Sequence, residues 1–210
     1  MAAKKKAKEL GRPADTDSEQ TRLSILRAAE YCFATRGFKN TSNRDVADRA
    51  GVTAATIYYY FKNKSDLFVS VNREVQEKVI AGVREVVDEA ETLVDGLVAI
   101  ANVFLDVHKD DPNIAKFNAV VRQEAMRNPE LSDVLEDQHW RDIFHELAEL
   151  GKKTGELDPK KDRELRAVLS LVNFGISHHA SESSMAAHEE CIRGVIDLFR
   201  GNLLKPPRKK

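Results

Sequence analysis

The segment from residue 53 to residue 64 carries the clearest chemistry in the chain, because hydroxyl, aromatic and basic side chains follow one another there. Tyrosine hydroxyls and lysine ammonium groups suit phosphate oxygens, which fix a protein's position on DNA without reading its sequence. Small side chains let a helix approach base edges, where a methyl group can meet the methyl of thymine. The candidate DNA contacts in this segment are Thr53, Ala54, Ala55, Thr56, Tyr58, Tyr59, Tyr60, Lys62 and Lys64.

The tyrosine run also has a plainer interpretation as an aromatic stripe in a core. Successive residues of a helix point about 100° apart, so three consecutive rings cannot all face inward. We therefore favour contact with phosphates. Three further donors, Ser42, Asn43 and Arg44, stand at the start of the preceding helical pattern and face the same kind of partner.

Two short helices must position these groups. Ser42 and Asp45 form a capping-box pattern, and Gly51 closes the helix after about two turns. Thr53 then caps the next helix. A helix reads the major groove only when a companion helix braces it across the phosphate backbone, and this pair joined by a glycine turn fits that need.

Apolar spacings of three and four residues continue through the rest of the chain, and no convincing alternating strand segment occurs. We expect an all-α fold. A first helix is predicted from an N-cap at Asp17 to Gly37, and a long helix from Asn63 to about residue 90 links an N-terminal head to a larger body. Further helices are expected near 92–109, 113–127, 130–152, 162–182 and 185–203.

Charge is distributed unevenly. Residues 1–64 contain 13 Lys and Arg against 7 Asp and Glu, which leaves a net charge of −7 on the rest of a chain whose total is −1. A basic head on an acidic body indicates a polyanion partner. Residues 1–16 are predicted to be a flexible basic arm that either reaches a minor groove or only aids solubility, and residues 205–210 a basic tail.

Two isolated cysteines indicate a reducing compartment, and no apolar run approaches the roughly 20 residues that cross a bilayer. We therefore expect a cytoplasmic protein that does not enter membranes.

The stretch DVADRAGVTAATIYYYFKNKSDLF resembles the DNA-binding head of TetR/AcrR-type regulators. Asp45, Ala47, Gly51 and Tyr60 are among the many positions that follow the family pattern. Ala54 and Ala55 depart from it, since Lys and Gly are common there. The resemblance covers about the first quarter of the chain in detail.

The resemblance implies a helix-turn-helix DNA-binding domain over 17–64 and a ligand-binding and dimerisation domain over 65–204. It also implies a homodimer that binds a double-stranded, pseudo-palindromic DNA operator and a small-molecule effector that releases it. The expected function is transcriptional repression. An alternative is a structural DNA-binding dimer with no effector, which a body without a cavity of a few hundred Å³ would favour.

Large apolar residues on the predicted body helices are candidate effector contacts, although core packing explains any one of them more simply. Arg122 and Arg141 are candidates for neutralising an acidic effector, with surface exposure as the simpler interpretation. Apolar stripes near the C-terminus, such as Leu165 to Ile176, either fill the monomer or pack against a twin subunit. The candidate ligand contacts are Phe104, Phe117, Val121, Trp140, Phe144 and Phe174.

Metal, cofactor and enzyme interpretations have little support. His178, His179 and Glu182 cannot easily share one site, because adjacent helical residues point apart. Glu136 and His139 form only one of the two Glu-x-x-His pairs that carboxylate-bridged metal bundles use. No phosphate loop, nucleophile elbow or H-E-x-x-H motif is present. We expect no metal, no cofactor and no catalysis.

Overall fold

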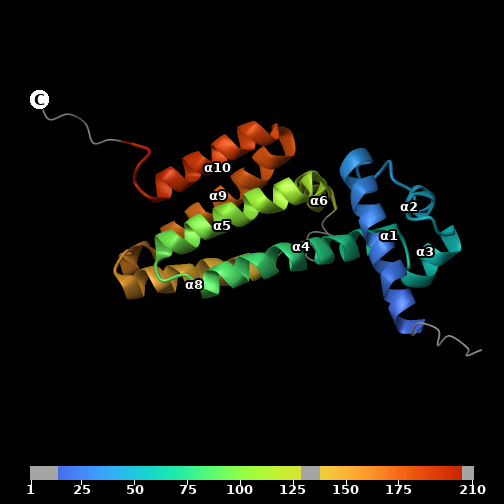
Figure 1. Cartoon of the computed structure of the whole chain (residues 1–210), viewed down its shortest axis with the longest axis horizontal. Helices are drawn as coiled ribbons and strands as arrows, with labels where there is room; N and C mark the ends of the chain where they lie inside the picture. The colour runs from blue at the N-terminus through green and yellow to red at the C-terminus, as the bar shows by residue number, and fades with distance from the viewer. Residues whose placement is uncertain (1–13, 129–137, 205–210) are drawn as a thin grey trace, which may run out of the picture.

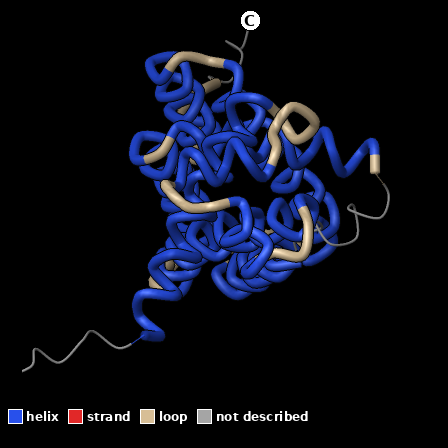
Figure 2. Tube along the Cα trace, turned by 90° about the vertical axis from the view of Figure 1, so that its right-hand side faces the viewer, coloured by secondary structure: helices blue, strands red, loops and turns tan. Residues whose placement is uncertain are grey.

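The computed structural model describes residues 14–128 and 138–204, and every regular element in these ranges is a helix, as predicted (Figures 1 and 2). The predicted termini 1–13 and 205–210 and the predicted helical residues 130–137 lie outside the described residues. The elements are α1 (Ala14–Arg36), α2 (Asn43–Ala50), α3 (Ala54–Tyr60), α4 (Lys64–Asp88), α5 (Leu93–Asp110), α6 (Pro112–Arg127), α8 (Gln138–Thr154), a 3₁₀ turn (Pro159–Lys161), α9 (Asp162–Glu182) and α10 (Met185–Phe199).

The three helices α1, α2 and α3 form the head, with α2 and α3 on the side of α1 that faces away from the body (Figure 1). Their shared core contains Ile25 of α1, Val46 of α2 and Ile57 of α3, all fully buried. Because α2 and α3 are too short to be stable alone, this core holds them in place.

Helix α4 connects the head to the body, as the sequence predicted. Its N-terminal half contributes Leu67 and Val71 to the core of the head, while Val83 and Val87 belong to a second apolar cluster with α5, α8 and α9. One continuous helix therefore takes part in both cores. A tilt of α4 within the body would also move its N-terminal half in the head.

Helix α6 makes a second connection. Phe117 of α6 is fully buried, and its ring lies 6.4 Å from the ring of Phe33 in α1 and 5.3 Å from that of Phe68 in α4. The head therefore packs against α6 as well as α4.

Several predicted boundaries were wrong. Helix α1 begins at Ala14, so Asp17 lies inside the helix rather than at its N-cap, and residues 14–16 of the predicted flexible arm are helical. At the other end, α10 stops at Phe199 instead of residue 203. None of the helices in the described ranges has both the length and the apolar character that a bilayer crossing requires.

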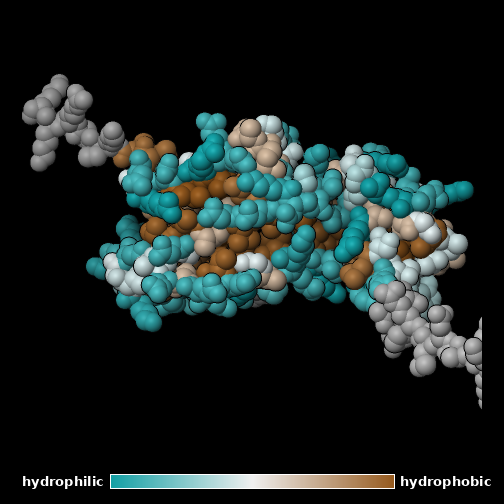
Figure 3. All heavy atoms as spheres, in the orientation of Figure 1, coloured by the Kyte–Doolittle hydropathy of each residue, from teal (hydrophilic) through white to brown (hydrophobic). Residues whose placement is uncertain are grey.

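Within the two C-terminal stripes, Leu169, Ile176 and Ile192 are buried in the monomer, and Val172, Val195 and Ile196 are half-buried. Other apolar residues of α9 and α10 are exposed instead, and Figure 3 shows apolar atoms between the polar ridges of the body. The exposed residues on these two helices are Val168, Leu171, Phe174 and Leu198.

Candidate nucleic-acid interface and internal cavities

The turn between α2 and α3 is built as the sequence predicted. Ser42 caps α2 through the backbone N–H of Asp45, whose carboxylate accepts a hydrogen bond from the Ser42 N–H at 2.8 Å. Gly51 has a φ of 70°, and its N–H donates to the carbonyl of Ala47. Thr53 caps α3 by accepting from the Thr56 N–H at 3.1 Å. These bonds fix where α2 begins and ends and where α3 begins.

The start and outer side of α3 form an exposed surface, which we call the α3 face. Tyr58 and Tyr59 keep 59% and 80% of their surface exposed, so their hydroxyls are free to meet a partner outside the protein. Hydroxyl, methyl and ammonium groups surround them. The exposed candidates on and beside the α3 face are Ser42, Arg44, Thr53, Ala54, Ala55, Tyr58, Tyr59 and Lys62, with Thr56 half-buried.

Three other candidates are engaged within the protein. The Lys64 ammonium donates to the carbonyls of Phe38 and Thr41 at 2.9 and 3.0 Å. The Tyr60 hydroxyl lies 3.1 Å from the carbonyl of Ser18, to which it donates. Asn43 is buried, and its Oδ1 has no hydrogen-bond partner. The Tyr60 bond joins α3 to α1 and the Lys64 bonds join the start of α4 to the turn after α1, whereas the exposed residues point outward.

Three adjoining cavities lie inside the body, and Phe104 lines all of them. The central cavity has about 790 Å³ of space including its open mouth. An apolar cavity of about 310 Å³ extends from it toward Leu97 and Phe144, and a histidine cavity of about 360 Å³ extends toward His108 and His188. Polar residues of the central cavity are Gln76, Asn118, Arg122, Ser170, Asn173 and Ser177.

Most of the predicted ligand contacts line these cavities. Trp140 lines the central and apolar cavities and stacks on Phe104 with ring centroids 5.4 Å apart. Val121 and Phe174 line the central cavity, and Phe144 lines the apolar one. Phe117 lines none of the three, because it packs in the aromatic core between α1, α4 and α6. Whether any of them touches a ligand stays a prediction.

Several polar groups at the cavities lack partners. The Arg122 guanidinium donates to the hydroxyl of Ser177 at 2.9 Å, but its Nη2 is buried without a hydrogen bond, as is the Oδ1 of Asn118. Both ring nitrogens of the fully buried His188 are also without partners. A buried polar group without a partner is costly, so these atoms are suited to receive a ligand.

Burial also changes the acid–base properties of this region. It lowers the pKa of His188 to about 4, with the neighbouring His108 and His179 adding to the effect. Burial likewise lowers the pKa of His108. The imidazole of His188 is therefore neutral at pH 7. The sequence pointed to Arg122 but missed His188, although His188 lies one turn before the buried Ile192 on the apolar side of α10.

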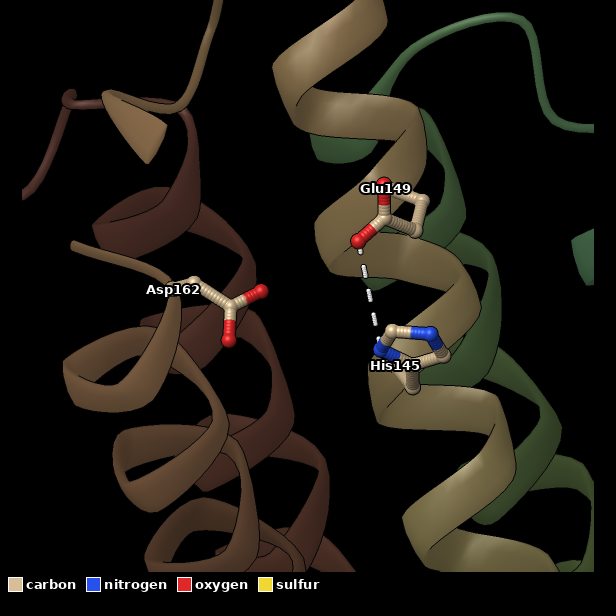
Figure 4. A group of neighbouring side chains, drawn as sticks. All are labelled: His145, Glu149 and Asp162. Atoms are coloured by element: carbon tan, nitrogen blue, oxygen red, sulfur yellow. Dashed lines mark ion pairs between the residues drawn. The ribbon is translucent and has the colours of Figure 1, made fainter. Parts of the chain in front are cut away.

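A different cluster, His145, Glu149 and Asp162, brings three potential metal ligands within 4.8 Å of one another (Figure 4). Both carboxylates are already paired, since the Lys152 ammonium lies 2.6 Å from Glu149 and 2.9 Å from Asp162, and the Arg166 guanidinium lies 2.6 Å from Asp162. We interpret the cluster as a surface ion-pair network. Of the predicted metal candidates, Glu136 lies outside the described residues.

Residues 25–71, which span the core of the head and the first part of α4, match the sequence profile described as "Bacterial regulatory proteins, tetR family". The chain belongs to the TetR family. It is a DNA-binding transcriptional regulator, with the helix-turn-helix head and larger helical body that the sequence led us to expect.

Relatives of this TetR-family protein align over nearly its whole length. The transcriptional regulator UidR of Escherichia coli K12 is 23% identical over 90% of this chain and 95% of its own. The structure of Salmonella enterica GusR is 27% identical, with a TM-score of 0.67 over 93% of this chain and 99% of that one. FadR of Bacillus subtilis, solved with stearoyl-CoA, shares the fold at 22% identity and a TM-score of 0.75, over 87% of this chain and all of its own.

Proposed function

We propose that this regulator is a homodimeric repressor that binds a pseudo-palindromic operator through the α3 face and leaves it when a small molecule enters the body. The observation that carries the proposal is the combination of an exposed, preorganised α3 face with a large internal cavity. The proposed contacts are the exposed residues of the α3 face, with Tyr60 tying α3 to α1 and Lys64 tying the start of α4 to the turn after α1.

Dimerisation is proposed to use the exposed apolar side of α9 and α10. Leu171 of α9 and Leu198 of α10 are 69% and 50% exposed, and these two helices pack against each other, so we propose that their exposed apolar residues form one interaction surface. A two-fold arrangement would present two α3 faces, which doubles the phosphate contacts and matches a palindromic sequence. The proposed division into a DNA-binding part at 17–64 and a ligand-binding and dimerisation part at 65–204 follows these roles.

Effector and DNA are proposed to compete through the packing of α4 and α6. Val79 of α4 and Val121 of α6 both line the central cavity, while other residues of these helices pack in the core of the head. A ligand that prefers a different arrangement of α4 and α6 therefore shifts the population away from the DNA-competent form. The cavity volume also favours this function over an effector-free structural dimer.

The DNA-binding claim is tested by selecting bound fragments from genomic DNA and measuring affinity for the selected duplex. We expect Tyr58→Ala to weaken binding by roughly tenfold or more. Lys62→Ala should weaken it and reduce the slope of log affinity against log salt by about 1. The control is Lys153→Ala on the exposed side of α8, which should change neither quantity. Undiminished affinity in both head variants would contradict the proposal.

Dimerisation is tested separately by light scattering. Leu171→Glu should convert the protein to a monomer at micromolar concentration, because a charge is placed in an apolar interface. Leu204→Glu changes an equally exposed leucine beyond the end of α10 and should leave the dimer intact. A dimer that persists in Leu171→Glu would place the interface elsewhere.

A further inference from the structure

The charge of Arg122 is unusual for its surroundings. Arg122 is the sole Asp, Glu, Lys or Arg among the described residues that line the central, apolar and histidine cavities. None of the ion pairs found in the described residues includes it. Its nearest interactions are the neutral Ser177 hydroxyl and the ring of Phe174, whose centroid lies 5.3 Å from the guanidinium carbon.

The Arg122 guanidinium lacks the negatively charged partner that a partly buried arginine ordinarily has. Arginine stays charged in proteins, and a partly desolvated charge without a counter-ion costs free energy. The buried Nη2 of Arg122 has no hydrogen-bond partner, and the side chain of Asn118 in the same cavity also has an unpaired atom. The guanidinium therefore has one edge available for a planar acceptor such as a carboxylate or phosphate.

The walls beyond Arg122 are apolar. Phe104, Val121 and Trp140 line the central cavity together with Arg122, and the adjoining apolar cavity is enclosed by residues such as Leu97, Phe144 and Leu169. A ligand that extends from Arg122 into these spaces would present a charged group at one end and hydrocarbon at the other.

We propose that Arg122 is the anion-binding residue of the effector cavity, and that the effector is an amphiphile with a single carboxylate or phosphate group and an apolar body. This inference rests on the proposed function, because it specifies the class of molecule to which the repressor responds. Arg122 lies on α6, five residues after Phe117 in the core of the head, so an anion drawn to Arg122 acts directly on a helix that supports the DNA-binding surface.

Binding can be measured by the fluorescence of Trp140, because the chain has a single tryptophan and it lines the cavity. The probes are decanoate, decyl phosphate and 1-decanol, used below the concentrations at which they aggregate. We expect at least one of the anions to bind the wild-type protein roughly tenfold or more tighter than decanol, since charge-assisted hydrogen bonds have about that effect. The tighter of the two anions identifies the head group.

The variant Arg122→Gln should lose this discrimination. Its affinity for the anions should fall to that of decanol, while decanol binding stays the same and shows that the cavity is intact. Arg122→Lys should recover part of the preference for anions. The control Lys153→Gln removes a positive charge from the exposed side of α8, the helix that carries Trp140, and should behave as wild type.

Equal affinity of wild type for decanol and the anions, an unchanged preference in Arg122→Gln, or binding of none of the three probes would overturn the anion site. Displacement of the selected operator duplex is measured in parallel. Arg122-dependent anion binding that leaves the duplex bound would keep the anion site and reject the effector-release function. Release by decanol without an anion preference would keep the release function and reject the anion site.

Discussion

The head and the body differ in how their polar groups are used. In the head, Ser42 and Asp45 bond to each other and the Tyr60 hydroxyl ties α3 to the Ser18 carbonyl of α1, while Tyr58 and Tyr59 face outward. The unpaired atoms of the head, in Asn43 and Glu30, do not line the three internal cavities. In the body, Arg122 and His188 keep unpaired polar atoms at internal cavities. The first arrangement suits a partner that docks from outside, and the second suits one that enters.

This difference in hydrogen bonding matches what each region has to do. A surface that grips phosphates at fixed positions requires preorganised side chains, because misplacement of α3 would lose several contacts together. A cavity that responds to a ligand requires groups that are incompletely satisfied until the ligand arrives, since only then does the ligand change the balance between two forms. A large-to-small substitution should therefore lower the free energy of unfolding more in the core of the head than around Phe104.

The largest expected effect tests this packing difference. Phe33 is fully buried and its ring contacts those of Phe38, Phe68 and Phe117, so Phe33→Ala should lower the free energy of unfolding by about 3–5 kcal/mol. Phe104→Ala enlarges cavities that already exist and should cost less than half as much. Urea unfolding at one protein concentration measures both, and equal losses would remove the proposed contrast.

The second prediction concerns the buried histidine. Its pKa is about 4 when folded and about 6.5 when unfolded, so the unfolded chain binds the proton more readily. Stability from neutral His188 is fully present above pH 6.5 and is lost as the pH falls toward 4. The loss should reach about 3 kcal/mol. It is measured by urea unfolding between pH 7 and 4.5.

Replacement by leucine should remove most of this acid sensitivity, because His188→Leu deletes the imidazole whose pKa is lowered to about 4 and leaves His108 as the other histidine of the cavity. The matched control is His145→Leu, which changes an imidazole that is 59% exposed and should retain the wild-type pH slope. If His188→Leu loses stability below pH 6 as steeply as wild type, the buried imidazole is not the group responsible.

The third prediction has the opposite pH slope and lies where the head meets the body. Burial, and then the neighbouring Asp111 at the start of α6, raise the pKa of Glu30 in α1 to about 7. The folded state therefore binds this proton more tightly than the unfolded chain. The stability that the protonated Glu30 carboxyl contributes is fully present below about pH 4.5 and is lost as the pH rises through 7. The loss should be about 1–3 kcal/mol.

Glu30→Gln should flatten the dependence between pH 5 and 8 and raise the stability at pH 8 relative to wild type, as followed by urea unfolding. Glu77→Gln alters an exposed carboxyl on α4 and should keep the wild-type slope. A variant Glu30→Gln that is less stable than wild type at pH 8 would show that the carboxylate is favourable at this junction.

The sequence predicted the head better than the body cavities, because the head depends on interactions between residues that are close in the chain. The caps at Ser42, Thr53 and Asn63 join residues only three positions apart, so the head could be located from local patterns. The start of α1 could not, since Asp17 has the chemistry of an N-cap but the helix continues back to Ala14. Local preference is weak where several starts are acceptable.

The cavities are a long-range property. Gln76, Phe104, Arg122, Trp140 and Ser177 come from five different helices before they share one wall. Five of the six candidate ligand contacts line the cavities, but the sequence could not show that the ring of Phe117 packs in the core of the head. It also could not show that Arg122 lacks a carboxylate partner, because that depends on what every neighbouring helix presents.

The smallest expected effect tests the rigidity of the head at one backbone position. Gly51 ends α2 with a φ of 70°, and no heavy atom lies within 4 Å of where a Cβ would stand. Gly51→Ala therefore adds no clash and measures the left-handed conformation alone, at a cost of about 1–2 kcal/mol. Gly82→Ala in the middle of α4 meets only ordinary contact with Val103 and should stabilise by about 0.5–1 kcal/mol. If thermal unfolding shows that Gly51→Ala destabilises the protein while Gly82→Ala stabilises it, the backbone conformation at Gly51 imposes the turn angle of the head. If both alanines stabilise the protein, the turn relaxes and α3 is less rigidly held than its hydrogen bonds indicate.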